Sequence, residues 1–165
     1  MVMRVTVQRK RYNPEMLKSG VVRVGFFEDK KYDDDLPVAQ VARWNEFGTN
    51  VDHGVPPRPF MRPAVFEKKK EFTELLRSQY RQAIKDNRNT MLVLHNFGHF
   101  VVEAIRSQID SVHTPENAPI TIHGGWLGRK GKKSVYIEGK GGSKPLYDTG
   151  FMLDSVDYQA EEVKK

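Results

Sequence analysis

The stretch from Trp44 to Val65, WNEFGTNVDHGVPPRPFMRPAV, joins the end of one helical pattern to the start of another through two glycines and four prolines. Each proline fixes its own φ and favours an extended, polyproline-like path. Residues 56–63, which we call the strut, are therefore expected to be stiff before they contact anything. Arg58, Phe60 and Arg62 occupy alternate positions on it.

Two interpretations of the strut stay open. In the first, its side chains contact a partner, because aromatic and arginine residues are enriched at interface hot spots. In the second, the prolines connect two helices, Phe60 fills the core, and Arg58 pairs with Glu46 or Asp52. The residues assigned to the partner interface here are Glu46, Phe47, Gly48, Arg58, Phe60 and Arg62.

Composition indicates a single domain, residues 1–165, with a modest core. The chain has 165 residues, 38% of them hydrophobic, and a formal net charge of +6. It has no cysteine, which excludes disulfides, thiolate nucleophiles and Cys-ligated metals. The start of the chain has no signal-peptide pattern and no stretch has membrane-spanning length, so we expect a soluble protein that folds in the cytoplasm.

Hydrophobic periodicity predicts the elements before the strut. Alternation predicts strands at residues 1–9 and 21–29, with Val22, Val24 and Phe26 facing the core. Residues 13–20 are expected to hold one helical turn. A helix is predicted at residues 37–48, beginning at Pro37 and ending at Gly48. The side chains expected on its inner face are Val38, Val41, Ala42 and Phe47.

After the strut, apolar residues recur at three and four, which predicts a helix of about six turns from Pro63 and a second over residues 90–112. The side chains expected on the inner faces are Val65, Phe66, Phe72, Leu75, Leu76, Ala83 and Ile84 of the first helix and Leu94, Phe97, Val101, Ile105 and Ile109 of the second. The chain is expected to close with a capped helical turn and a strand. The predicted fold is α+β, with a small antiparallel or mixed sheet backed by the two long helices. A glycine-rich extended arm or β-hairpin is inserted at residues 117–147.

The arm contains an alternating segment, KSVYIEG at residues 133–139, and is too apolar for a solvated linker. We expect it to order on a partner, with this segment added to the edge of a neighbouring subunit's sheet. Trp126, Tyr136 and Ile137 are assigned to that interface. The residues assigned to contact with an acidic partner or with DNA in a channel are Arg129, Lys130, Lys132 and Lys133.

Three patterns that suggest enzyme or ligand chemistry are weak. His95, His99 and Glu103 have the i, i+4, i+8 spacing of ligands on one helix face, but surface polar residues have it too. The basic loop GRKGKK lacks the GxxxxGK[ST] order of a phosphate-binding loop. Asp148, Thr149 and Gly150 spell the DTG of aspartic proteases, yet they are placed to cap the following turn. We therefore assign no catalytic, cofactor-binding or metal-binding residue.

Three stretches occur in order along the chain: VAQVARWNEFGT, VPPRPFMRPAV and KPLYDTGFMLDSV. Together they resemble the small neck and tail-completion proteins of long-tailed bacteriophages and prophages, often labelled minor tail, virion morphogenesis or head-tail connector proteins. The resemblance runs from about residue 21 to residue 158. It is interrupted by a longer, basic, glycine-rich insertion where relatives pass almost directly from an APL..STI..KG segment to KPLxDTG.

The resemblance implies a structural virion protein without catalysis, assembled in the host cytoplasm as a ring, six-fold in the expected form, at the neck or tail terminus. Its partners would be copies of itself and head-tail connector, tail terminator or tail tube proteins. No cofactor, metal, small-molecule ligand or membrane is expected, and contact with packaged DNA is non-specific. The alternative is a basic nucleic-acid-binding module, whose basic loops could also line a DNA channel.

Overall fold

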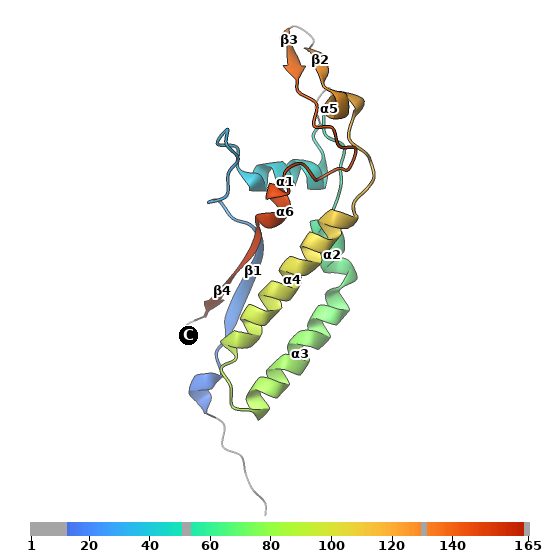
Figure 1. The fold of residues 1–165 in the computed structure, drawn as a ribbon. Helices are drawn as coiled ribbons and strands as arrows, with labels where there is room; N and C mark the ends of the chain where they lie inside the picture. The colour runs from blue at the N-terminus through green and yellow to red at the C-terminus, as the bar shows by residue number, and fades with distance from the viewer. Residues whose placement is uncertain (1–12, 51–53, 130–131, 164–165) are drawn as a thin grey trace, which may run out of the picture.

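The computed structural model describes residues 13–50, 54–129 and 132–163 (Figure 1). The predicted strand at residues 1–9 lies outside the described residues. The elements in chain order are η1 (Pro14–Met16), β1 (Gly20–Phe26), α1 (Val38–Phe47), α2 (Met61–Glu67), α3 (Lys69–Lys85), α4 (Met91–Ser111), α5 (Pro119–His123), β2 (Gly125–Arg129), β3 (Lys132–Ile137), α6 (Phe151–Asp154) and β4 (Val156–Glu162). Both sheets in the described part are antiparallel pairs, β1 with β4 and β2 with β3, so the predicted α+β class is confirmed.

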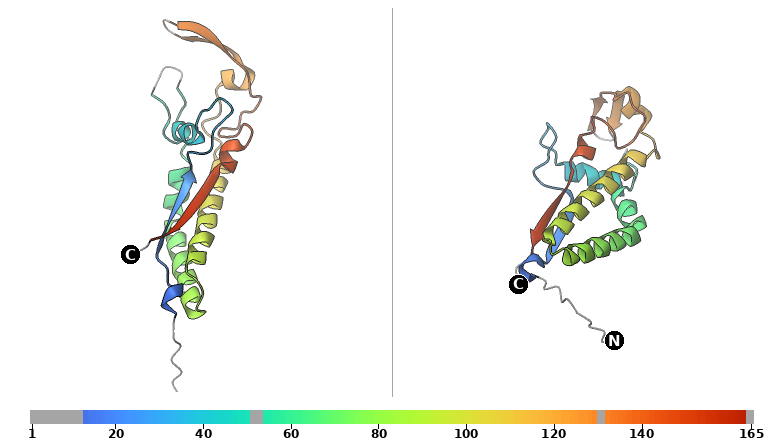
Figure 2. Two further views of the ribbon diagram at one scale, coloured as in Figure 1. Left: turned by 90° about the vertical axis from the view of Figure 1, so that its left-hand side faces the viewer. Right: turned by 60° about the horizontal axis from the view of Figure 1, so that its bottom comes forward.

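Helix α4 is the central element of the body. Of the residues predicted on its inner face, Leu94, Val101, Ile105 and Ile109 are buried and Phe97 is half-buried, with Ile105 and Ile109 each 1% exposed. This helix packs on both strands of the β1–β4 sheet and on α2 and α3 (Figure 2). Phe72 of α3 meets Phe97 and Phe100 of α4 edge to face, with ring centroids 5.8 Å apart in each pair. The two long helices are therefore packed together as predicted, and α4 makes the direct contact with the sheet.

The β1–β4 sheet brings the two ends of the described chain side by side. Its register runs from Gly20 opposite Glu162 to Phe26 opposite Val156. Val24 and Phe26 pack against the core, whereas Val21 and Arg23 on the opposite face of the strand are exposed, as the alternation predicted. The strand that pairs with β1 thus comes from the far end of the sequence.

Gly98 lets β4 approach α4 closely. A Cβ atom at this position would lie 2.2 Å from Cδ2 of Tyr158, whose ring lies against the helix. The absence of a side chain at Gly98 is therefore a packing requirement, despite the cost of glycine inside a helix.

We expect Gly98→Ala to lower the free energy of unfolding by about 1–3 kcal/mol, because overpacking against Tyr158 outweighs the gain of at most about 1 kcal/mol in helix propensity. Urea unfolding monitored by circular dichroism measures the change. In a Tyr158→Ala background the same substitution should be neutral or stabilising. An equal loss in both backgrounds would show that Tyr158 is not the obstacle.

The helix predicted from Pro63 is instead two helices, α2 and α3, which meet at Lys68. Helix α2 begins at Met61, two residues before the predicted start, and Pro63 is tolerated because it lies in the first turn. Val65 and Phe66, predicted to be inward, are 42% and 70% exposed. The side of α2 that is buried carries Ala64, at 2% exposure. Periodicity identified the helical segment but not which of its apolar faces packs on α4.

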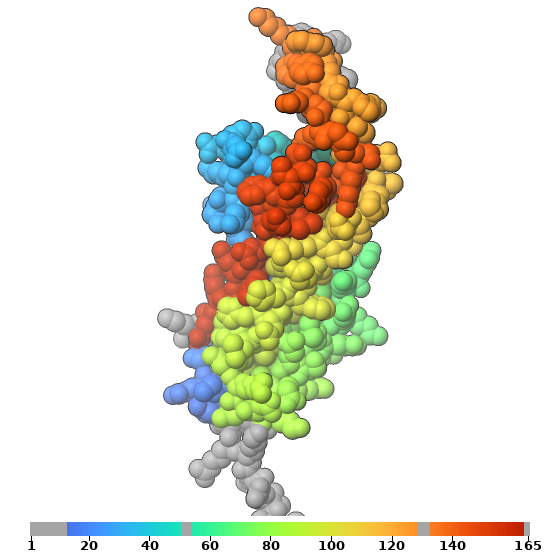
Figure 3. Space-filling view, viewed as in Figure 1, coloured from blue at the N-terminus to red at the C-terminus, as the bar shows by residue number. Residues whose placement is uncertain are grey.

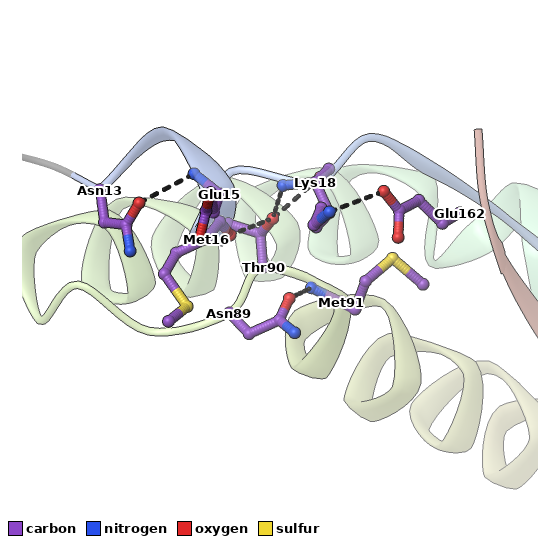
Figure 4. A network of polar contacts seen from close by, with 8 residues as sticks. All are labelled: Asn13, Glu15, Met16, Lys18, Asn89, Thr90, Met91 and Glu162. Carbon is purple, nitrogen blue, oxygen red and sulfur yellow. Dashed lines mark hydrogen bonds and ion pairs between the residues drawn. The ribbon is translucent and has the colours of Figure 1, made fainter. Parts of the chain in front are cut away.

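The turn between α3 and α4 is tied to the segment before β1 through Thr90, which is 1% exposed (Figure 4). Its hydroxyl oxygen accepts the Lys18 amide at 2.7 Å, and the carbonyl oxygens of Lys18 and Met16 lie at 2.8 and 3.1 Å as acceptors for the hydroxyl hydrogen. The Thr90 amide donates to the Met16 carbonyl at 2.9 Å. Beside this contact, Lys18 and Glu162 form an ion pair at 3.0 Å.

We expect Thr90→Val to lower the free energy of unfolding by about 1–3 kcal/mol, because the shape is kept while the Lys18 amide loses its acceptor in a buried position. Chemical denaturation gives the value. Thr73→Val is the matched control, since the exposed Thr73 hydroxyl donates only to the Lys69 carbonyl of its own helix. That control should stay within about 0.5 kcal/mol of the wild type. Equal losses at the two positions would contradict a tie through Thr90.

Candidate functional site

The last turn of α1 places a buried carboxylate at the start of α2. Glu46 is 3% exposed. Its Oε2 accepts the amides of Phe60 and Met61 at 2.7 and 2.9 Å, and its Oε1 accepts the amide and the Nε of Arg62 at 3.2 and 2.8 Å. These amides have no partner within α2, so Glu46 caps the helix from another element.

Two opposing effects set the pKa of Glu46. Burial raises the pKa. The hydrogen bonds from the Phe60 amide, from the Arg62 side chain and from the amides of Met61 and Arg62 lower it, and their combined effect is larger than that of burial. The pKa of the carboxyl therefore lies below its ordinary value, and Glu46 is charged at neutral pH.

The prediction that Phe47 faces the core is wrong. Phe47 is 61% exposed, and the Arg62 guanidinium lies over its ring at 4.7 Å. The buried side chains Val38, Ala42 and Glu46 instead follow one another at intervals of four. The polar Glu46 takes the inner position because it satisfies the first amides of α2. That spacing was the signal in the sequence that would have found its role.

Gly48 ends α1 and turns the chain into the strut. Its φ is +74°, and a Cβ atom there would lie 3.0 Å from the ring of Pro57 and from the Val55 carbonyl. Phe47 remains an exposed candidate for a partner contact, whereas Gly48 acts within the chain by allowing this turn.

The strut buries the side chains of Arg58 and Phe60, which corrects the first interpretation for these two residues. Phe60 is fully buried and meets Phe26 edge to face, with ring centroids 6.1 Å apart. Arg58 is 5% exposed and donates to the carbonyl oxygens of Pro115 and Glu116 at 2.7 and 2.8 Å. Its pKa is lowered by burial. Phe60 thus fills the core, as the second interpretation proposed.

Arg58 does not form the ion pair with Glu46 that the second interpretation proposed. Glu46 pairs with Arg62 at 2.8 Å, and Arg58 binds carbonyl oxygens that follow α4. Asp52 lies outside the described residues. The strut therefore ties α1, α2 and the chain after α4 into one unit.

Beside Arg58 lies a groove of about 630 Å³ between α1, the loop before it, and the α6 turn. Tyr32 of the loop meets Phe151 of α6 edge to face, with ring centroids 5.3 Å apart. Figure 3 shows the loop, in blue, and the α6 segment, in red, at the end of the body from which the arm rises. Its lining includes the side chains of Tyr32, Asp33, Asp34, Trp44, Tyr147 and Phe151. The groove could not be predicted from the sequence, because its walls come from segments far apart in the chain.

Carboxylates surround one wall of the groove. Burial, Asp148 and Asp34 together raise the pKa of Tyr32. The loop at residues 28–35, EDKKYDDD, carries five carboxylates and two lysines. Among the ion pairs of the described residues, the two lysines take Asp29 and Asp35, and none includes Asp33 or Asp34. The rim at Asp33 and Asp34 is therefore available to a cation.

The DTG segment is a structural turn. The Thr149 hydroxyl accepts the Phe151 amide at 3.3 Å, and Gly150 has a φ of +82°. Asp148 forms an ion pair with Lys140. The N-cap residue of α6 is Gly150, which supplies the left-handed backbone and has no side-chain cap bond. Thr149 stabilises the turn through the Phe151 amide, and Asp148 fastens the arm.

The arm contains the hairpin rather than a single strand. Strand β3 pairs with β2 of the same chain, so the expectation that residues 133–139 add alone to a neighbouring sheet is corrected. Trp126 and Tyr136 are direct cross-strand partners with ring centroids 5.4 Å apart, and they are 71% and 58% exposed. Ile137 faces the other side of β3 and is half-buried.

The basic residues of the arm are described in part. Lys133 is exposed on β3. Arg129 and Lys132 end β2 and begin β3, where the register shifts, and Lys130 lies outside the described residues.

The base of the arm is fastened to the body. The Asn117 side-chain amide donates to the carbonyl oxygens of Gly142 and Lys144 at 3.1 and 3.0 Å. Lys144 forms an ion pair with Asp110 of α4, and its hydrogen bond lowers the pKa of that carboxyl. The root of the hairpin is therefore set relative to α4.

The histidine pair of α4 contacts β4. His95 Nδ1 lies 3.3 Å from the Tyr158 hydroxyl, and the His99 ring lies 4.6 Å from the Tyr158 ring. Glu103 pairs instead with Arg106, at 3.1 Å. Within residues 13–50, 54–129 and 132–163, no group of three His, Asp or Glu side chains is arranged to hold a metal ion.

Comparison of the chain with known protein families, with characterised proteins and with solved structures found no match. Of the helices in the described part of the chain, none has the length and hydropathy needed to cross a membrane. The surface features of the described residues that could bind a partner are the groove and the exposed aromatic pair of the hairpin.

Proposed function

We propose that this protein is a structural component of a tailed bacteriophage, forming a ring at the neck or tail terminus that joins tail to head. The observation that carries the proposal is the meeting of the three resemblance stretches in one place. Trp44, Arg58 and residues 146–152, one from each stretch, line the same groove. Val38, Phe60 and Met152, again one from each, share the buried core. Stretches that are separated in sequence but build one site are a stronger basis than any of them alone.

The shape of the molecule supports assembly through unlike surfaces. The hairpin rises from one end of an elongated body, and the groove lies at its root (Figures 1 and 3). A contact between two different surfaces of the same chain is heterologous, and it closes into a ring when its rotation divides a full turn. The ring is expected to contain six copies, with connector, terminator or tube proteins on its two sides. This role needs no catalysis.

Imaging of phage particles tests the proposal. The gene would be expressed from its native genome, and the protein located in tailed particles by cryo-electron microscopy and by quantitative mass spectrometry. We expect a closed ring on the tail axis at the head-tail junction, and a monomer or weak oligomer for the isolated chain. Absence from particles, or a tight two-fold dimer that persists in them, would overturn the proposal.

A second candidate, a nucleic-acid-binding module, rests on one observation. Trp126 and Tyr136 expose their rings on a hairpin that also exposes Lys133. Stacking of bases on aromatic rings beside cations is a common mode of single-strand binding. This candidate predicts binding to single-stranded DNA that weakens steeply with salt and is lost in Trp126→Ala. Fluorescence anisotropy with a labelled oligonucleotide distinguishes it from the structural role.

A further inference from the structure

The β2–β3 hairpin exposes an aromatic pair that its own chain does not cover. Trp126, at 71% exposure, and Tyr136, at 58%, lie on one face of the hairpin. Apart from the pairing of its strands, the hairpin packs chiefly on α5 (Figure 2). Large aromatic side chains at such exposure on a projecting element are typical of a protein contact.

The groove has the complementary composition. Trp44, Tyr147 and Phe151 line it and remain 36%, 52% and 36% exposed. Its volume, about 630 Å³, lies within the range of roughly 300–1,000 Å³ that accepts an organic ligand, and is thus large enough for an aromatic pair. The groove therefore offers an aromatic lining to an aromatic guest.

Charge favours the same match. Residues 125–137 contain four lysine or arginine residues and no carboxylate. The groove rim carries Asp33 and Asp34, for which no ion pair is found among the described residues. An acidic rim favours a basic protein hairpin as the occupant and repels a nucleic acid.

The hairpin of a chain points away from the groove of the same chain. Thr121 and Lys140, at the root of the arm, form part of the groove wall, and the hairpin extends from that root away from the body (Figure 1). The Lys140 amide donates to the Thr121 carbonyl at 2.8 Å, which holds the root in place. The hairpin of a chain is therefore directed away from that chain's own groove, where it can contact another copy.

We propose that the β2–β3 hairpin of one copy docks in the groove of the next, with Trp126 and Tyr136 among the groove aromatics and the net positive charge of the hairpin attracted by Asp33 and Asp34. Each copy then supplies one hairpin and one groove, so the contact is head-to-tail. The inference rests on the proposed function in that it requires assembly of this chain with itself.

Site-directed crosslinking tests the contact in the full chain, which has no cysteine of its own. Asp33→Cys and Lys133→Cys variants would be prepared separately and mixed at high concentration with a short bismaleimide. We expect a two-copy product that contains one chain of each kind, and little product from either variant alone. Products from each variant alone, or no mixed product, would overturn the docking.

Association measurements identify the side chains that carry the contact. Trp126→Ala is expected to weaken self-association at least about 30-fold in sedimentation velocity, the loss of one hot-spot residue. Asp33→Lys combined with Asp34→Lys should weaken it similarly, and Lys132→Glu with Lys133→Glu in the partner copy should restore it. Leu92→Ala, exposed at 58% on the start of α4, is the control and should change nothing.

Outcomes separate this inference from the proposed function. If rings form in particles but Trp126→Ala and the aspartate variants assemble normally, the docking is wrong and the structural role stands. If the wild type is absent from particles, the role fails, whereas a mixed crosslink would still support the docking. If Trp126→Ala weakens only DNA binding, the hairpin is a nucleic-acid contact and the docking is overturned.

Discussion

Replacing Phe60 by alanine is expected to lower the free energy of unfolding by about 3–5 kcal/mol. Phe60 is fully buried and packs edge to face on Phe26, so its removal leaves a cavity between β1 and the start of α2. Urea unfolding of the purified chain measures the loss. Phe66→Ala is the matched control, because Phe66 is 70% exposed one turn along α2. The control should stay within about 0.5 kcal/mol of the wild type.

This result would support the second interpretation of the strut, because under the first, in which its side chains contact a partner, Phe60→Ala and Arg58→Ala would disrupt assembly more than folding. Because both side chains are buried within the chain, any assembly defect should follow the loss of stability. Full assembly defects in Phe60→Ala protein that melts like the wild type would restore the interface interpretation.

The second large effect is expected at Glu46. Glu46→Ala should lower the free energy of unfolding by about 3–5 kcal/mol, because the amides of Phe60, Met61 and Arg62 lose their common acceptor where water has little access. Chemical denaturation at neutral pH gives the value. Glu103→Ala is the control, since Glu103 pairs with Arg106 at the exposed surface. Its loss should not exceed about 0.5 kcal/mol. Equal losses would mean that Glu46 acts only as a surface charge.

The lowered pKa of Glu46 predicts that the free energy of unfolding depends on pH in the acid range. Its pKa is lowered in the folded chain, so unfolding raises the proton affinity of the carboxyl. The stability that it contributes is fully present above the ordinary glutamate pKa, about 4.3, and is lost as the pH falls through the lowered folded value. Glu46→Gln, which keeps the shape without the charge, should lose less stability than the wild type over that acid range. Parallel pH profiles of the two proteins would contradict this.

Local elements were predictable because they depend on neighbours in sequence. The alternation in β1, the repeat of apolar residues along α4 and the turn from Thr149 to Phe151 each follow from side chains within a few residues of one another. Gly48 likewise marked the end of α1. Such patterns report which residues share a face. They do not report what that face meets.

The candidate site was predicted only in part. Trp126 and Tyr136 were predicted as contact residues because the arm is too apolar for a solvated linker, and the structure places both at exposed positions. The alternative of an arm with only one β-strand is wrong, because β3 pairs with β2. The sequence of β2 has a weaker strand pattern, so this pairing was not evident from the sequence. Arg58 and Phe60 were open to two interpretations because sequence shows the stiffness of a strut but not the surfaces around it.

By itself, the sequence determined the class of fold, the positions of the main elements and the stiffness of the strut, since these depend on local backbone preference and periodicity. Tertiary structure alone decided that Glu46 rather than Phe47 faces inward and that Arg58 binds carbonyl oxygens 57 and 58 residues away. It also decided that a groove opens between a loop, α1 and the α6 turn. The physical reason is that burial and hydrogen-bond satisfaction are settled between distant segments, where one chosen contact excludes the alternatives that local pattern leaves open.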